Sequence, residues 1–270
     1  MVIRGQSGTV GEQTRTVARA IDVLLCFSHS EPELSLTEIS TKLGLHKSTL
    51  HRLLGTLESR RFVQRDLVSG RYRLGTKLLE LAALVAEHND LQKRARPHLY
   101  RLADECQETV DLSILDNSEV VYLEVLESSQ RVKLAARAGQ RLPAHSTASG
   151  KAFLAYLPAS ELQAILSSEF TRYTDSTLAT DEALMRDLQA TRERGFAMSV
   201  QEHEVGINAV AAPILDVAGY PIAAIAVAGP SFRLTESRML EIAPSIRVVA
   251  DAIAREVGSD RVLNILPSGR

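Results

Sequence analysis

Membrane-spanning and secretory segments are both absent from this 270-residue sequence. No apolar run approaches the roughly 20 residues that a helix needs to cross a bilayer. The first residues, MVIRGQSGTVGEQT, lack the apolar core of a secretory signal. We therefore expect a cytoplasmic protein with no membrane partner and a loose polar tail at its N-terminus.

Cysteine is scarce, and its spacing argues against two kinds of site. Cys26 and Cys106 are the only cysteines, and neither belongs to a CxxC or a Cys/His pattern. Disulfide frameworks and zinc sites both depend on such patterns. We predict two packed thiols, no metal and no other cofactor.

The motifs of two enzyme classes are missing as well. Gly150 and Lys151 are followed by alanine, and no glycine stands five residues before Gly150, so the phosphate-binding loop of nucleotide hydrolases is not present. No serine lies in a G-x-S-x-G elbow, which leaves Ser149 with His145 or His203 as a poor hydrolase triad. The prediction is a protein that is not an enzyme and has no catalytic residues.

Charge is distributed unevenly along an otherwise ordinary composition. The chain is 45% hydrophobic and 24% charged, and it is long enough for two domains that each bury a core. Residues 1–77 carry 12 Lys and Arg against 7 Asp and Glu, or +5, whereas residues 78–270 carry 19 against 26, or −7. The basic part is a candidate for a polyanion partner, with an ordinary solvated surface as the alternative.

Three helices are predicted in the basic part. The first lies within residues 14–27, where apolar residues recur at helical spacing: Val17, Ile21, Leu24 and Leu25. The second begins near Thr37, is capped by Ser35 or Thr37, and ends at Gly44. The third begins near Lys47.

The third helix has two faces of opposite character. Four leucines share one side at about 100° per residue and are predicted to face the core: Leu50, Leu53, Leu54 and Leu57. The other side is small, hydroxylated and basic: Ser48, Arg52, Gly55 and Ser59, flanked by Thr49 and His51. Glycine weakens a helix interior by about 0.5–1 kcal/mol relative to alanine, so Gly55 indicates the close approach of a neighbour.

A basic hairpin is predicted after this helix, where RRFVQRDLVSGRYRLG has two extended runs around a turn at Asp66, Ser69 and Gly70. Three helices followed by a hairpin are the order of a winged helix-turn-helix, which indicates double-stranded DNA as the partner. The third helix would lie in the major groove, and the hairpin would lie on the DNA backbone or in the minor groove. The predicted DNA-binding residues are Thr37, Lys47, Ser48, Thr49, His51, Arg52, Arg65, Arg71 and Arg73. The alternative is a ligand-sensing scaffold that binds a protein partner through this domain.

An apolar helix is predicted next, in TKLLELAALVAEHND. It either packs against its own chain or pairs two subunits. The second arrangement suits a homodimer that reads DNA half-sites one helical turn apart.

The remainder of the chain mixes strands with helices. After a helix that begins at Leu91, strands are predicted in TVDLSIL, VVYLEVL, VKLAA, GFAMSVQE, NAVAAPILDV and PIAAIAVAG, and helices near 148–157, 160–167, 181–194 and 235–257. Clustered strands with helices between the clusters predict an α+β sheet domain.

A candidate ligand site stands at the start of the helix near 148–157. Free backbone N–H groups at a helix start attract anions, and small residues there allow close approach: Thr147, Ala148, Ser149 and Gly150. These residues are candidates for holding a carboxylate, and an ordinary capped helix is the alternative.

Five segments carry a family resemblance: GLHKSTLHRLLGTLESRRFV, GRYRLG, AHSTASGKAFLAYLP, TRERGFAMSVQEHEVGINAVAAPILD and AAIAVAGPSFRLT. They are similar to the isocitrate lyase regulator (IclR) family of bacterial transcription factors, over about residues 14–257. The resemblance implies an α+β protein with a winged helix-turn-helix, a linker helix and a GAF-like antiparallel-sheet effector-binding domain, in a dimer or a dimer of dimers. It implies a sequence-specific regulator whose operator binding responds to a small organic acid.

Domain limits follow from the same resemblance: a tail at 1–13, the winged helix-turn-helix at 14–75, the linker helix at 76–90, the effector-binding domain at 91–258 and a tail at 259–270. Small-acid effectors of the family lie between the helix start at 147–150 and the central strands. This placement adds the matching strand positions to the candidate effector residues: Ser199, Ala209, Ala226 and Ala228.

The chain departs from the family pattern on one of these strands. Members that bind small oxo-acids carry hydrogen-bonding side chains where this chain has Ala226 and Ala228. Losing each buried polar partner costs about 1–3 kcal/mol, so we predict an organic acid with an apolar or aromatic body. Glu202, His203 and Glu204 either gate the pocket or form a solvated cluster.

Overall fold

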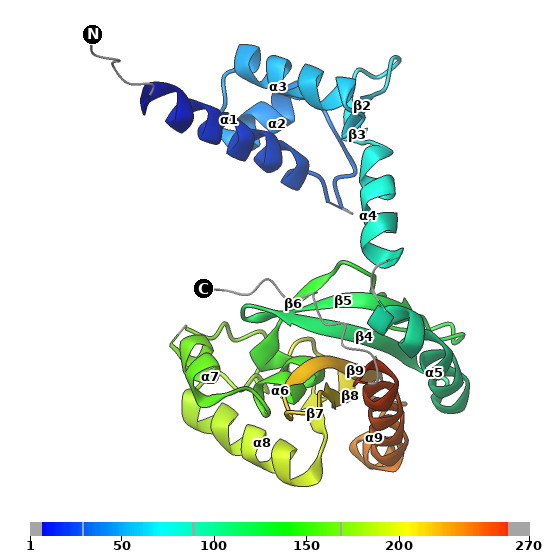
Figure 1. The fold of residues 1–270 in the computed structure, drawn as a ribbon. Helices are drawn as coiled ribbons and strands as arrows, with labels where there is room; N and C mark the ends of the chain where they lie inside the picture. The colour runs from blue at the N-terminus through cyan, green and yellow to red at the C-terminus, as the bar shows by residue number, and fades with distance from the viewer. Residues whose placement is uncertain (1–6, 29, 88–89, 168, 259–270) are drawn as a thin grey trace. The chain divides into compact units, whose positions relative to one another are not determined.

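The chain folds into two units, residues 1–88 and 89–270 (Figure 1). This computed structural model describes residues 7–28, 30–87, 90–167 and 169–258. Of the two predicted tails, residues 1–6 and 259–270 lie outside these ranges. None of the helices within them has both the length and the hydropathy of a bilayer span.

Unit 1 is a winged helix-turn-helix. Its elements are α1 (Ser7–Leu25), β1 (Glu33–Leu34), α2 (Leu36–Leu43), α3 (Lys47–Ser59), β2 (Val63–Arg65), β3 (Tyr72–Leu74) and α4 (Lys77–Glu87). The strands form an antiparallel sheet in the order β1-β3-β2. The hairpin was predicted, whereas β1 was not, because two residues are too few to show a strand pattern.

The turn between α2 and α3 is set by local chemistry. The Ser35 hydroxyl accepts a hydrogen bond from the Glu38 backbone N–H, and the Glu38 carboxylate accepts one from the Ser35 backbone N–H. This reciprocal cap satisfies two donors that a helix start leaves free. Gly44 ends α2 at φ 61°, a left-handed conformation that glycine adopts without strain. The predicted limits of α2 and α3 are confirmed to within a residue or so.

Of the apolar stripe predicted on the first helix, only Leu24 packs against the core of unit 1. Val17, Ile21 and Leu25 are exposed, and the buried contacts come from Val23 and from Phe27 just beyond the helix. The helix also begins at Ser7, so residues 7–13 are helical rather than a tail. Once the packed turns have formed, each further residue adds a backbone hydrogen bond at little cost.

Unit 2 is built on a six-stranded sheet in the order β6-β5-β4-β9-β8-β7, in which every neighbouring pair is antiparallel. Its strands are β4 (Thr109–Asp116), β5 (Glu119–Leu126), β6 (Arg141–Pro143), β7 (Ala197–Val200), β8 (Ile207–Leu215) and β9 (Pro221–Pro230). Its helices are α5 (Asp90–Cys106), α6 (Ala148–Leu154), α7 (Ala159–Leu166), α8 (Asp181–Arg194) and α9 (Glu236–Gly258), and a short 3-10 turn, η1 (Ala144–Ser146), precedes α6. The predicted α+β class is confirmed.

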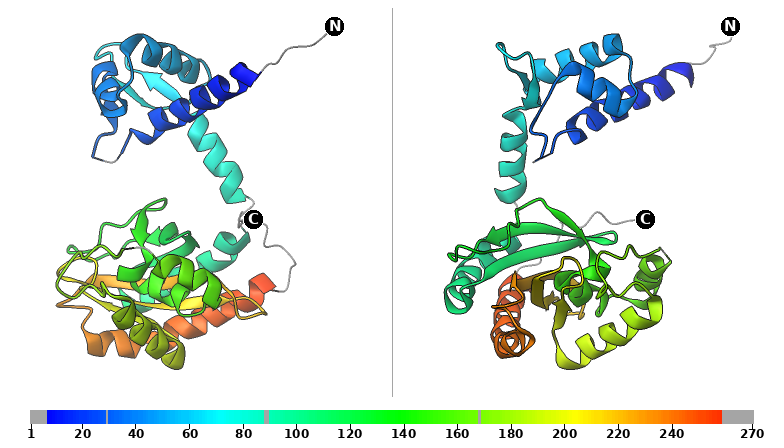
Figure 2. Two further views of the ribbon diagram at one scale, coloured as in Figure 1. Left: turned by 90° about the vertical axis from the view of Figure 1, so that its left-hand side faces the viewer. Right: turned by 180° about the vertical axis from the view of Figure 1, so that it is seen from behind.

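The two faces of this sheet are covered by different helices (Figures 1 and 2). α5 and α9 bury one face, where Val110 and Leu112 of β4 join the largest core. α6 packs on the other face, to which the alternation of a strand directs Asp111 and Ser113. A polar row of β4 therefore lies on the α6 side of the sheet.

One predicted strand is wrong. The run VKLAA, residues 132–136, has no strand partner, and the chain crosses it as irregular backbone. Three of its apolar residues instead line a cavity: Leu134, Ala135 and Ala136. Short apolar runs look alike in both settings.

Candidate functional site

The outward side of α3 carries most of the predicted DNA-binding residues. Lys47, Ser48, His51 and Arg52 are exposed on it, and Thr49 is half-buried. All four predicted leucines on the opposite side are buried in the core of unit 1, and this burial sets which side of α3 faces outward. Cations and hydroxyls in the first turns of such a helix are the groups that contact phosphates and base edges.

The cations of this face are not neutralised within unit 1. Neither Lys47 nor Arg52 forms an ion pair inside the described ranges. A Cβ added at Gly55 would meet nothing within 4 Å, so the neighbour predicted beside this glycine is not part of the chain that the structure describes. Thr37 is exposed on α2.

The three hairpin arginines have different surroundings. Arg71 is half-buried, and its Nη2 donates to the Glu38 carboxylate and to the Glu33 carbonyl, each at 2.9 Å. Arg65 and Arg73 are exposed, with the Arg65 guanidinium 5.6 Å from the centre of the Tyr72 ring. Arg71 thus ties the hairpin to α2, which leaves Arg65 and Arg73 as the hairpin cations that face solvent.

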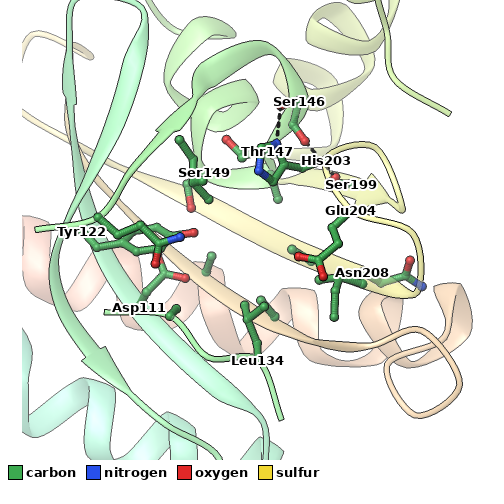
Figure 3. A pocket seen from close by; sticks show the side chains of 18 of the residues that line it. Asp111, Tyr122, Leu134, Ser146, Thr147, Ser149, Ser199, His203, Glu204 and Asn208 are labelled. Carbon is green, nitrogen blue, oxygen red and sulfur yellow. Dashed lines mark hydrogen bonds between the residues drawn. The ribbon is translucent and has the colours of Figure 1, made fainter. Parts of the chain in front are cut away.

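Unit 2 encloses a cavity of about 130 Å³ on the α6 side of its sheet (Figure 3). Seven of the eight predicted effector residues line it: Thr147, Ala148, Ser149, Ser199, Ala209, Ala226 and Ala228. The fold brings them together from the start of α6 and from β7, β8 and β9. The pocket therefore lies where the sequence predicted a ligand.

The eighth predicted residue, Gly150, is not among the residues that line the cavity, and close packing accounts for the glycine. A Cβ at this position would lie 2.1 Å from the Ala144 carbonyl oxygen, so only glycine fits there. Its backbone N–H donates to the Thr147 hydroxyl at 3.1 Å and is therefore occupied. Because α6 is also only seven residues long, the backbone at its start is a weaker anion site than predicted.

Polar residues outside the predicted effector set also line the cavity: Asp111, Tyr122, Gln140, Ser146 and Asn208. His203 and Glu204 line it too, which agrees with the first of the two alternatives given for them. One signal for the residues outside the predicted set was available. Asp111 interrupts the apolar strand run TVDLSIL, and a polar residue in such a run is either solvent-facing or buried for a reason. Tyr122 and the segment around residue 140 carry no comparable signal.

Asp111 is the most unusual group of the lining. Its side chain lies on β4 opposite Ala226 of β9, is 1% exposed, and has no hydrogen-bond partner for Oδ1 in the described structure. Burial raises the pKa of its carboxyl to about 8, and the Ser149 hydroxyl offsets only part of this effect. The carboxyl is therefore uncharged at neutral pH.

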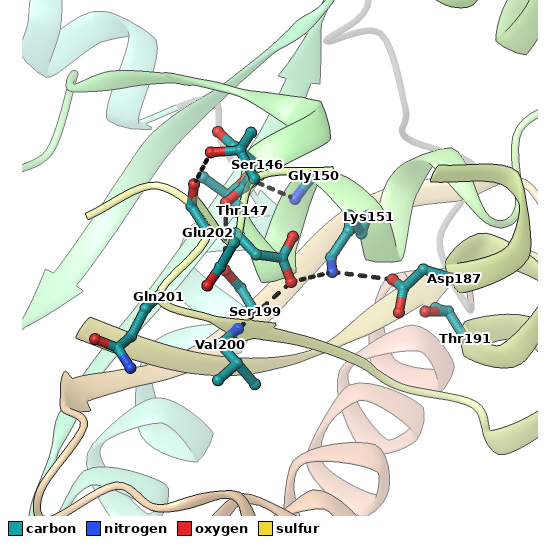
Figure 4. Close-up of polar contacts among 12 residues, drawn as sticks. Ser146, Thr147, Gly150, Lys151, Asp187, Thr191, Ser199, Val200, Gln201 and Glu202 are labelled. Atoms are coloured by element: carbon teal, nitrogen blue, oxygen red, sulfur yellow. Dashed lines mark hydrogen bonds and ion pairs between the residues drawn. The ribbon is translucent and has the colours of Figure 1, made fainter. Parts of the chain in front are cut away.

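A buried cation close to the cavity is paired with two carboxylates (Figure 4). Lys151 is fully buried, and its Nζ lies 2.7 Å from Glu202 Oε1 and 2.9 Å from Asp187 Oδ2. Burial raises the pKa of Glu202, and Lys151 opposes this rise. Lys151 therefore joins α6 to α8 through Asp187 and to the loop after β7 through Glu202, whereas His203 and Glu204 of that loop line the cavity.

No catalytic or metal arrangement is formed by the histidines near the cavity. His145 Nε2 lies 3.0 Å from the Thr171 carbonyl and His203 Nδ1 3.1 Å from the Ser146 hydroxyl, so neither bonds Ser149. Burial lowers the pKa of both histidines. In the ranges that the structure covers, no three metal-ligating side chains gather in one place.

Comparison with known proteins gives the same two-part organisation. The family model of the IclR helix-turn-helix domain matches residues 16–67, and that of the bacterial transcriptional regulator IclR C-terminal domain matches residues 83–255. The HTH-type transcriptional regulator XynR of Escherichia coli strain K12 is 36% identical over 245 residues, which cover 90% of this chain and 97% of XynR.

Solved structures agree in fold over nearly the whole chain. The IclR protein of Thermotoga maritima has a TM-score of 0.75 at 31% identity, covering 91% of this chain and 99% of the other. An IclR homolog from Microbacterium hydrocarbonoxydans, solved in complex with 4-hydroxybenzoate, has a TM-score of 0.82 at 27% identity and covers 91% and 100%. The chain belongs to the IclR family of bacterial transcriptional regulators, with a helix-turn-helix DNA-binding domain followed by an IclR effector domain.

Proposed function

We propose that this protein binds a pseudo-palindromic DNA operator through α3 and the hairpin, and that a small organic acid in the cavity of unit 2 changes this binding. The exposed, hydroxylated and basic side of α3 over a buried leucine face is the observation that carries the proposal. Ser48, Thr49 and Arg52 would read base edges, and Lys47, Arg65 and Arg73 would contact phosphates.

The dimensions and lining of the cavity support an acid with a compact apolar or aromatic body. Its volume of about 130 Å³ is close to the roughly 150 Å³ of an engineered protein cavity that holds benzene. Apolar side chains form much of the wall: Leu134, Ala135, Ala136, Leu142, Ile207, Ala209, Ala226 and Ala228. Binding of 4-hydroxybenzoate by the Microbacterium homolog is consistent with such a ligand.

A homodimer, or a dimer of dimers, is the assembly that we propose. Leu79 and Val85 on α4 are 72% and 70% exposed, and Val17 and Leu25 on α1 are 60% and 75% exposed. Large apolar side chains that are exposed on two helices of a small unit favour burial against a second copy. Two α3 helices related by a twofold axis would then read two half-sites.

Operator selection is tested with DNA that the wild-type protein enriches from a random-sequence pool. Affinity should fall with salt at a log–log slope near −0.9 per contacted phosphate. Arg52→Ala should lose about 10–100-fold of the preference for the selected sequence, since one bidentate base contact is worth about 1–3 kcal/mol. The exposed Arg186→Ala in unit 2 is the matched control and should change nothing.

The same experiment separates this proposal from a scaffold that binds a protein. Carboxylic acids that raise the melting temperature of the full chain are added to the DNA titration, and at least one should change operator affinity. The thermal shift itself should survive in Arg52→Ala. Binding without sequence preference or salt dependence would favour the scaffold.

A further inference from the structure

The cavity of unit 2 contains buried oxygen atoms that the chain leaves without partners. Asp111 Oδ1 is one, and Asn208 Oδ1 is a second in the same lining. In Figure 3 the two residues lie toward different ends of the pocket. Native proteins leave few such atoms, and each costs about 1–3 kcal/mol when nothing bonds it.

The unpartnered carboxyl of Asp111 is not explained by the packing around it. Its neighbour across the strands is Ala226, and the next inward position of β4, Ser113, faces Ala224. An apolar residue on β4 would continue the alanine-lined wall and would cost less to bury. A hydrogen-bonding group on a bound molecule would provide the missing partner.

The charges of the lining limit what that molecule is. Asp111 and Glu204 contribute carboxyl groups, and among the residues that the structure describes no lysine or arginine lines the cavity. Lys151, which follows Gly150 on α6, is held by Glu202 and Asp187 outside the cavity. A ligand with two carboxylates would therefore meet carboxyls and no cation.

We infer that Asp111 determines the specificity of the effector pocket, and that its carboxyl accepts a hydrogen bond from a hydroxyl or N–H group of a ligand that carries a single carboxylate. The inference rests on the proposed effector function. It places the hydrogen-bond donor of that ligand next to Asp111.

Two further observations fit this assignment. Because burial raises the pKa of Asp111 to about 8, its carboxyl is uncharged at neutral pH and tolerates one carboxylate elsewhere in the cavity. A neutral carboxyl keeps a carbonyl oxygen that accepts and a hydroxyl that donates. The volume of about 130 Å³ admits a single ring or a short chain bearing both groups.

Matched pairs of monocarboxylates test the inference on the full-length protein by calorimetric titration. The probes are benzoate against 3- and 4-hydroxybenzoate, and pentanoate against 5-hydroxypentanoate, with terephthalate as the dicarboxylate. At least one hydroxylated member should bind the wild type about tenfold or more tightly than its parent, and terephthalate should not bind. Asp111→Leu should abolish the preference, and Asp111→Asn, which keeps an acceptor oxygen, should retain most of it.

Ser113→Ala is the control, because Ser113 also has a buried unpartnered oxygen on the same side of β4 but does not line the cavity. It should leave every affinity unchanged. Equal binding within all pairs, no binding by any hydroxylated probe, or a preference that persists in Asp111→Leu would overturn the inference. If Asp111→Leu does not fold, equal binding within the wild-type pairs would still overturn the inference, and Asp111→Asn still tests the role of its oxygen. The proposed function fails separately, if a probe that binds leaves operator affinity unchanged.

Discussion

On the outward side of α3, Lys47 and Arg52 lie in solvent without a carboxylate beside them, whereas the buried cation next to the cavity of unit 2, Lys151, is enclosed and paired. The first arrangement leaves positive charge available to a polyanion, where affinity depends on salt. In the second arrangement the lysine charge is not available to a ligand. Unpaired hydrogen-bonding atoms such as Asp111 Oδ1 remain in the cavity instead. The outward side of α3 thus offers exposed charge to a partner, whereas the cavity of unit 2 offers hydrogen bonds that are shielded from water.

The largest effect is expected from breaking the buried pairing around Lys151. Lys151→Met should lower the free energy of unfolding of unit 2 by about 3–5 kcal/mol, because Glu202 and Asp187 lose the cation they face. Lys133→Met removes an exposed ion pair with Glu127 and should change the free energy of unfolding far less, because solvent screens that pair. Urea unfolding followed by far-ultraviolet circular dichroism measures both, since the chain has no tryptophan. Equal losses in the two variants would show that the pairing of Lys151 is not structurally important.

The raised pKa of Asp111 leads us to expect that the stability of the folded chain depends on pH. Its pKa is raised to about 8 in the folded chain from about 4 in an unfolded chain, so the folded state holds one more proton between these values. Stability therefore falls as pH rises through that window, by about 1.4 kcal/mol per pH unit. Asp111→Asn removes the titrating group, so its advantage over the wild type should grow by about 3 kcal/mol between pH 5 and pH 7.

The difference between these two proteins isolates Asp111 because Tyr122, whose pKa the charge of Asp111 also raises, stays protonated throughout this pH window. The titratable groups that face Asp111 across the cavity are Tyr122 on β5 and His203 and Glu204 on the loop after β7. The pKa of Tyr122 is raised and that of His203 is lowered, in each case mainly by burial. Exposed Asp251→Asn serves as the control. A stability difference that does not vary with pH would mean that the carboxyl of Asp111 is ionised in the folded state.

A smaller effect distinguishes two arginines of the hairpin. Arg73→Ala should lower the salt slope of DNA binding by about one phosphate contact and leave stability unchanged, since Arg73 is exposed. Arg71→Ala should leave the slope nearly unchanged and destabilise unit 1, since Arg71 holds the Glu38 carboxylate and the Glu33 carbonyl. Salt titrations with the selected DNA and thermal melts measure the two quantities. If Arg71→Ala lowered the salt slope and left stability unchanged, Arg71 would be a DNA contact.

Unit 1 was largely predictable from sequence because its determinants are local. The leucine spacing of α3, the cap at Ser35 and the left-handed stop at Gly44 each act within a few residues. The exposed stripe of α1 was read only as a helix pattern, and periodicity alone does not say whether an apolar face is buried by its own chain or is left for a second one. The sequence did not indicate that Arg71 pairs with Glu38, 33 residues earlier, because this is a tertiary contact.

The cavity of unit 2 was located through family resemblance, and its chemistry was not. Thr147 and Ser199 were placed correctly, yet Asp111 was missed because its burial depends on β4 lying at the centre of the sheet beside β9. Gly150 was assigned to ligand binding although the nearby Ala144 carbonyl explains it. The burial of Asp111 arises from the pairing of β4 with β9, more than a hundred residues later, which a linear pattern does not record.

The smallest predicted effect concerns Gly55, where stability and function should separate. Gly55→Ala should stabilise unit 1 by about 0.5–1 kcal/mol, because alanine is the better helix former and the added Cβ meets nothing within 4 Å. The same methyl group should weaken binding to the selected DNA, since Gly55 lies on the side of α3 assigned to the duplex. Thr56→Ala, at the neighbouring exposed position, is the control for a general change in helix stability. A gain in stability with unchanged DNA affinity would mean that the duplex does not approach the middle of α3, which would confine recognition to its first turns.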